Sequence, residues 1–198
     1  MFSGGTAESV STDGDVVLDI GANDGPLLNT YSIPGLKLIG CEPANNLVDS
    51  LGEVTDYVMH DFWIYDSYKK HTEKWGLGKA KVITAIGMFY DLDEPNIFIN
   101  DVAKALDKDG VFVAQLMCLS NMLKKNDLGN ICHEHIEFYS LESLRYMFES
   151  NGLEIFKIDE NEVNGGSYRI FARHLDKGSI HFDESYSIND LHEFKSRI

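Results

Sequence analysis

The side chains best suited to chemistry stand in one short loop, where acids and glycines follow an apolar run. Val16 to Ile20 is β-branched and apolar apart from one acid, which is typical of a buried strand. The residues that could hold a ligand here are Asp19, Gly21, Ala22, Asn23 and Asp24, and Gly25 closes the loop. This order predicts a nucleotide-type cofactor site at the carboxyl end of a parallel strand, followed by a helix. A surface turn is the alternative, because short glycine loops are weak signals.

The loop lacks the glycine spacing that holds a pyrophosphate. A dinucleotide loop needs G-x-G-x-x-G, so that backbone amides and a helix N-terminus face the phosphates. Here Gly21 and Gly25 stand four residues apart, and Asp24 would repel a phosphate. Carboxylates suit a ligand that is positively charged and carries no phosphate. We therefore expect S-adenosylmethionine and disfavour NAD.

Further candidate cofactor residues follow the next strand-like runs. They are Glu42, Pro43, Asp61, Phe62, Ile86 and Met88. Glu42 could accept hydrogen bonds from two ribose hydroxyls, and Asp61 with Phe62 could hold an adenine. The alternatives are a solvated loop acid for Glu42, and core packing for Phe62 and the apolar pair Ile86 and Met88.

A second group of ionisable residues is Cys132, His133, Glu134 and His135. The i,i+2 spacing of the histidines matches neither H-E-x-x-H nor a zinc finger, although an extended segment would put both on one face. Acid–base chemistry suits the cluster better, because histidine titrates near neutral pH and a glutamate can orient it. A polar loop without a chemical role remains the alternative. We expect no bound metal.

The candidate cofactor residues can form one site only if the strands that precede them end at the same edge of one sheet. Strand-like runs lie at residues 16–20, 36–41, 57–59, 81–86, 111–116, 154–159 and 168–173. Helical spacing links Ile64 to Trp75 and Phe98 to Leu106, and a further helix is expected between Ser140 and Gly152. Strands that alternate with helices predict an α/β fold with a mostly parallel sheet and helices on both faces. The last two runs are too close for a crossover, so we expect a terminal antiparallel hairpin.

Composition narrows the class of protein. The 198 residues suffice for about one domain, with 43% hydrophobic and 25% charged residues. A net charge of −15 argues against binding nucleic acid or an anionic membrane surface, and favours a small-molecule substrate. The sequence shows no export signal, no membrane span and no cysteine framework, so we expect a cytoplasmic protein. It leaves the oligomeric state open.

Taken in order, these motifs resemble a known family, the S-adenosylmethionine-dependent sugar C-methyltransferases that act on nucleotide-linked keto-deoxysugars. The resemblance runs from about residue 15 to 174 and is most specific at His133-Glu134-His135 with the following Phe138-Tyr139-Ser140-Leu141. Other matching stretches are the loop from Asp19 to Gly25, Phe89 to Pro95, and Asn164 to Arg169. The resemblance implies a Rossmann-like class I methyltransferase domain over residues 15–175.

The resemblance also implies roles for individual residues. Asp19, Gly21, Asn23, Glu42 and Asp61 would hold the cofactor. His135 would remove a proton beside the sugar ketone, Glu134 would contact sugar hydroxyls, and the enolate carbon would take the methyl group. An O- or N-methyltransferase of another metabolite, or an inactive cofactor-binding module, are the alternatives.

Three departures from the family pattern stand in the sequence. Cys132 replaces a usual tyrosine, and Asp91 stands where a histidine is common. The family's N-terminal zinc-binding domain and C-terminal domain have no counterpart here. We therefore expect a fragment, a minimal homologue or an enzyme with another substrate, with residues 1–14 weakly ordered and 176–198 a C-terminal extension.

Overall fold

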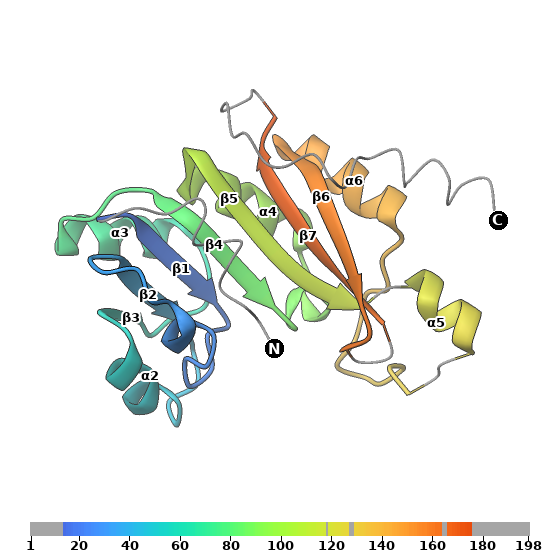
Figure 1. The fold of residues 1–198 in the computed structure, drawn as a ribbon, viewed down its shortest axis with the longest axis horizontal. Helices are drawn as coiled ribbons and strands as arrows, with labels where there is room; N and C mark the ends of the chain where they lie inside the picture. The colour runs from blue at the N-terminus through green and yellow to red at the C-terminus, as the bar shows by residue number, and fades with distance from the viewer. Residues whose placement is uncertain (1–13, 118, 127–128, 164–165, 176–198) are drawn as a thin grey trace.

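Seven strands form one sheet within the residues that the computed structural model describes, which are 14–117, 119–126, 129–163 and 166–175. The strands are β1 (Val16–Ile20), β2 (Lys37–Cys41), β3 (Tyr57–Met59), β4 (Ala80–Ile86), β5 (Leu106–Met117), β6 (Leu153–Asn161) and β7 (Ser167–His174). Their spatial order is β3-β2-β1-β4-β5-β7-β6 (Figure 1). The first five pair in parallel, and β7 runs antiparallel to both β5 and β6. The predicted sheet and terminal hairpin are confirmed.

Helices cover both faces of the sheet, as predicted. The helices are α2 (Val48–Val54), α3 (Tyr65–Trp75), α4 (Pro95–Ala105), α5 (Leu119–Lys125) and α6 (Leu141–Ser150), with 3-10 turns η1 (Leu28–Thr30) and η2 (Phe89–Asp91). Alternation along β1 separates two cores. Leu18 lies in the larger core, to which α3, α4 and α6 contribute, whereas Val17 packs with Leu51 of α2. In Figure 1, α4 lies behind β5 and β7.

The start of α6 follows the expected capping chemistry. The Ser140 hydroxyl accepts a hydrogen bond from the backbone N–H of Ser143, and the Ser143 hydroxyl accepts one from the N–H of Ser140. This capping box satisfies two amides that the helix itself cannot. Helix α6 in turn buries Leu144 and Phe148 against the sheet.

The prediction of a helix directly after Gly25 was wrong. The structure has only η1 there, and β2 begins at Lys37. Pro34 explains part of this result, because the residue before a proline avoids the helical region. The chain therefore passes from the loop to β2 in a short, mostly irregular segment. The short helices α2 and α5 were not predicted.

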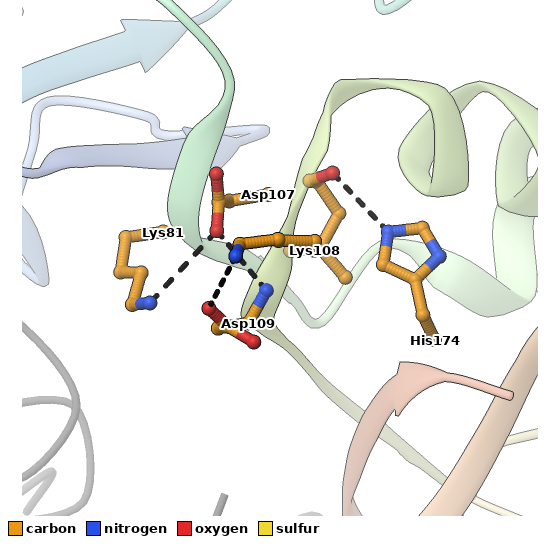
Figure 2. A network of polar contacts seen from close by, with 6 residues as sticks. Lys81, Asp107, Lys108, Asp109 and His174 are labelled. Carbon is orange, nitrogen blue, oxygen red and sulfur yellow. Dashed lines mark hydrogen bonds and ion pairs between the residues drawn. The ribbon is translucent and has the colours of Figure 1, made fainter. Parts of the chain in front are cut away.

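The start of β5 also differs from the prediction, which placed Leu106 in a helix and began the strand at residue 111. β5 begins at Leu106, opposite Ala80, and the register then shifts so that Val111 faces Val82. Asp107 accepts the Asp109 backbone N–H at 3.0 Å and lies 3.9 Å from the Lys81 ammonium (Figure 2). The extra residues are thus held as an irregularity within the strand at the amino edge of the sheet.

The predicted weak order of residues 1–14 and the extension at 176–198 fall almost wholly outside the described residues, as do Asn164 and Gly165 of the hairpin turn. Among the described helices, none is long and apolar enough to cross a membrane.

Candidate cofactor and acceptor site

Asp19 is the most deeply buried carboxylate at the carboxyl edge of the sheet. Its side chain is 4% exposed and accepts a hydrogen bond of 2.5 Å from the Thr84 hydroxyl on the neighbouring strand β4. Burial raises the pKa of Asp19 to about 7, against the lowering effect of Thr84, and the nearby Glu42 raises it further. A buried acid with one hydroxyl partner is poised to receive a cation, because a positive charge would favour its ionised form.

Glu42 joins the two loops that follow β1 and β2. Its Oε2 accepts the Asn23 backbone N–H at 3.0 Å, and its Oε1 accepts the Ala44 N–H at 2.9 Å. The side chain is 8% exposed. Each carboxylate oxygen has a second lone pair, so Glu42 can brace both loops and still accept from ribose hydroxyls. Pro43 stands half-buried beside it.

The amides of the loop are occupied by the protein itself. Gly21 and Ala22 donate to the Cys41 carbonyl, Asn23 donates to Glu42, and Gly25 donates to the Ala22 carbonyl. The Asp24 N–H bonds the Asn23 side chain at 3.1 Å. A phosphate site needs such N–H groups to point at the ligand. The loop therefore fits a ligand that donates hydrogen bonds and carries positive charge, and it does not fit a pyrophosphate.

Asp61 and Phe62 follow β3 at the same edge. Asp61 accepts the Ser67 hydroxyl at 2.6 Å and the Phe62 backbone N–H at 2.9 Å. The Ser67 hydrogen bond lowers the pKa of Asp61, so its carboxylate is charged at neutral pH. Phe62 is 73% exposed and does not pack in the core, unlike the alternative considered from the sequence. An exposed aromatic face beside a fixed acceptor is suited to an adenine.

Met88 closes the other side of the loop after β1. A Cβ atom on Gly21 would lie 3.3 Å from Met88 Cγ, so the absence of a side chain at Gly21 permits this approach. Ile86, at the end of β4, is half-buried, and Gly87 donates its N–H to the Gln115 carbonyl at 3.0 Å. The structure thus brings Met88 close to Gly21 and places Ile86 at the end of β4, at the strand ends where open α/β sheets bind ligands.

The Cys132 to His135 segment forms a turn and is not extended. The His135 N–H donates to the Cys132 carbonyl at 3.3 Å. The side chains of His133 and Glu134 are 91% and 65% exposed and lie 3.4 Å apart. His135 is half-buried instead, so the two histidines differ in their surroundings. Within the described part of the chain, no group of three or more His, Cys, Asp or Glu side chains is arranged for a metal ion.

His135 is fixed in one tautomer and one orientation. Its Nδ1 lies 2.8 Å from the Asn130 carbonyl oxygen, which can only accept, so Nδ1 carries the proton. The other nitrogen, Nε2, is then the proton acceptor of the neutral ring. The ring packs edge-to-face on Tyr90, with centroids 4.6 Å apart and planes at 73°. The Glu137 N–H also donates to the Tyr90 carbonyl at 3.1 Å.

These contacts join the H-E-H segment to η2, which directly follows the cofactor edge of β4. Asp91 lies near both His135 and Glu134: burial raises the pKa of Asp91, His135 lowers it, and Glu134 raises it again. Sequence reasoning missed Tyr90 as a contact of His135. Its only signal was its place within the Phe89 to Pro95 stretch that resembles the sugar C-methyltransferases.

Gln115 and Arg169 form a further polar pair at this edge. They face each other on β5 and β7, and the Gln115 Oε1 accepts from Arg169 Nε at 3.1 Å and Nη2 at 2.9 Å. Burial lowers the pKa of Arg169, although Asp159 on β6 opposes this. Because Gln115 also binds Gly87 through its backbone, this pair fixes the end of β4. Nothing in the spacing of these residues predicted the contact.

Comparison with known proteins agrees with this geometry. The family model described as a methyltransferase domain matches residues 7–158. The chain belongs to this methyltransferase family. It is also 30% identical over 161 residues to the C-methyltransferase NovU of Streptomyces niveus; the match covers 81% of this chain and 38% of that protein. The chain therefore spans well under half the length of this curated relative.

Solved structures show the same fold at low sequence identity. Magnesium protoporphyrin IX methyltransferase from Synechocystis PCC 6803, solved with S-adenosylhomocysteine, aligns with a TM-score of 0.62 and 13% identity over 86% of this chain and 78% of that one. A TehB-like S-adenosylmethionine-dependent methyltransferase from Corynebacterium glutamicum gives 0.60 and 12% identity over 87% and 86%. These structures confirm the predicted class I fold. The family match shows that the chain contains a methyltransferase domain.

Proposed function

We propose that the protein transfers the methyl group of S-adenosylmethionine to a carbon atom of a nucleotide-linked keto-deoxysugar. The proposal is supported most by the fixed tautomer of His135, which leaves Nε2 as a base in a ring that packs on Tyr90 of η2, shortly after the end of β4. An O- or N-methyltransferase needs no base able to form an enolate. The similarity to a C-methyltransferase points the same way.

Separate groups of residues would bind the methyl donor and the methyl acceptor. Asp19 and Glu42 would bind the positively charged and hydroxyl groups of the cofactor, and Asp61 with Phe62 would bind its adenine. S-adenosylmethionine, when bound, supplies an electrophilic methyl group. His135 Nε2 would take a proton from the carbon beside the ketone, whose C–H electron pair then forms the enolate. Glu134, exposed beside His133, would contact the sugar hydroxyls.

The position of the new methyl group tests this reaction. We would incubate the protein with ¹³C-methyl S-adenosylmethionine and a thymidine diphosphate-linked keto-deoxysugar, and locate the label by NMR. A carbon-bound methyl group is expected, because only an enolate presents a nucleophilic carbon. His135→Ala should lower the transfer rate about 100-fold or more, the usual contribution of a general base.

His174→Ala is the matched control. His174 is half-buried like His135, but it lies at the opposite edge of the sheet, where its Nε2 contacts the Leu106 carbonyl at 3.2 Å. This variant should keep the wild-type transfer rate within about threefold. A methyl group on oxygen, or transfer by His135→Ala at the wild-type rate, would contradict the proposal. Binding of the cofactor without any transfer would instead support the inactive-module alternative.

A further inference from the structure

A tyrosine stands between the base and the cofactor edge without a recorded partner for its hydroxyl. Tyr90 is only 7% exposed, and its ring packs on His135. Its hydroxyl oxygen lies 3.6 Å from the position that a Cβ atom would take on Gly87. The structure shows no hydrogen bond from this hydroxyl to any described residue. The oxygen is not among the buried side-chain atoms that lack a partner in the described residues, so it reaches the surface, where an external acceptor can meet it.

The position of Gly87 indicates where a hydrogen-bond acceptor for the Tyr90 hydroxyl would lie. Gly87 is exposed, follows β4 directly, and precedes Met88, whose Cγ would lie 3.3 Å from a Cβ atom on Gly21 in the loop after β1. Apart from its chain neighbours, the Tyr90 hydroxyl is the one atom of the described residues within 4 Å of a Cβ on Gly87. The Tyr90 side chain therefore reaches from the His135 ring to the exposed backbone at Gly87, directly after β4.

We propose that Tyr90 is a catalytic residue whose hydroxyl donates a hydrogen bond to the ketone oxygen of the methyl acceptor. This inference rests on the proposed function. When His135 Nε2 removes the proton from the adjacent carbon, the C–H electron pair forms the carbon–carbon double bond and the carbonyl π pair moves to oxygen. The Tyr90 O–H stabilises that oxyanion without losing its own proton.

The electrostatics of Tyr90 suit a donor. Burial raises the pKa of Tyr90, and Asp91 and Cys132 raise it further, so the hydroxyl keeps its proton at neutral pH. A neutral phenol aimed at a developing oxyanion in a partly dry site is a known way to promote enolisation. The same contact between the two rings fixes the distance between base and donor.

Exchange of the hydrogen beside the ketone with solvent measures enolate formation separately from methyl transfer. The keto-deoxysugar nucleotide would be incubated in D₂O with the protein and S-adenosylhomocysteine, and deuterium uptake beside the ketone followed by NMR. Tyr90→Phe, which keeps the ring contact with His135, should slow uptake about 10- to 100-fold. Its affinity for S-adenosylmethionine, measured by titration calorimetry, should stay within about twofold of wild type.

Tyr139→Phe is the matched control, because it removes a buried hydroxyl that has no hydrogen-bond partner among the described residues. The Tyr139 ring packs on Phe89 in the core. Its uptake should remain within about twofold of wild type. Uptake that requires His135 but is unchanged in Tyr90→Phe would overturn the role of Tyr90 alone. A wild-type protein that catalyses no uptake would overturn both this role and the proposed carbon methylation.

Discussion

The two edges of the sheet both carry acids, but they use them differently. At the amino edge, Asp107 and Asp109 lie near Lys81 and Lys108 in a network of ion pairs and backbone contacts (Figure 2). At the carboxyl edge, the described contacts of Asp19 and Glu42 are with a hydroxyl and backbone amides, and the recorded ion pairs include neither residue. Acids next to protein cations are neutralised within the protein, whereas acids held by neutral donors remain available to a cationic ligand.

Glycines at the two edges give the largest expected difference in stability. Gly25 in the cofactor loop and Gly76 at the end of α3 have nearly the same left-handed backbone, with φ of 82° and 71°. A Cβ on Gly25 would overlap Val54 Cγ2 and lie 3.1 Å from Leu51 Cδ1, whereas a Cβ on Gly76 meets nothing within 4 Å. Gly25→Ala should cost about 3 kcal/mol, from backbone strain and overpacking.

Gly76→Ala is the control. It should lower the free energy of unfolding by about 1 kcal/mol, from the strain of a left-handed backbone alone. Urea unfolding of both variants measures the difference in free energy of unfolding. If both variants lost the same free energy of unfolding, the loop after β1 would be loosely packed. It would then not differ in packing from the turn at Gly76 on the amino edge.

The second contrast concerns pH. Asp19 has a native pKa of about 7 and an ordinary value of 3.8, so the native state binds more protons than the unfolded state between these values. The free energy of unfolding that Asp19 contributes is therefore fully present below about pH 4. It is lost as the pH rises through about 7, where native Asp19 must ionise in a buried site. Asp19→Asn removes this titration, so the variant should exceed wild type in stability at pH 8 by on the order of 2 kcal/mol, and not at pH 4.

Asp107→Asn at the amino edge is the control, because the Asp107 side chain is 38% exposed and lies 3.9 Å from Lys81. Its stability should differ from wild type by less than about 1 kcal/mol at either pH. Thermal unfolding at pH 4 and 8 measures both. If the stability advantage of wild type over Asp19→Asn instead grew as the pH rose, the sign would be reversed. That result would contradict a buried Asp19 that has no ion pair among the described residues.

The smallest effect is expected from the ion pair at the amino edge. Lys81→Met should change the free energy of unfolding by less than about 0.5 kcal/mol, since the pair is long and partly exposed. The affinity for S-adenosylmethionine should not change, because Lys81 lies near the start of β4, opposite the cofactor edge. Loss of affinity in titration calorimetry would mean that the two edges are coupled.

The sequence predicted features that depend on neighbouring residues, and it did not predict contacts between distant segments. The parallel sheet and the glycine-containing loop after β1 followed from local patterns, because apolar runs and glycines near their ends mark strands and turns directly. The binding of a cofactor by this loop stays a prediction. The ring contact between Tyr90 and His135 could not be found this way, since it joins η2 to a loop about 45 residues later through tertiary packing. The occupied amides of the loop after β1 depend likewise on Cys41, the last residue of β2, and on Glu42 directly after it.

The central claim is that the carboxyl edge holds the methyl donor with its reactive end toward His135. A crystal structure of the protein with S-adenosylhomocysteine tests it most directly. We expect ribose hydroxyls on Glu42, the adenine between Asp61 and Phe62, and the sulfur facing a space that His135 Nε2 and the Tyr90 hydroxyl border. A sulfur atom walled off from both side chains, or a cofactor bound away from Asp19 and Glu42, would contradict the account.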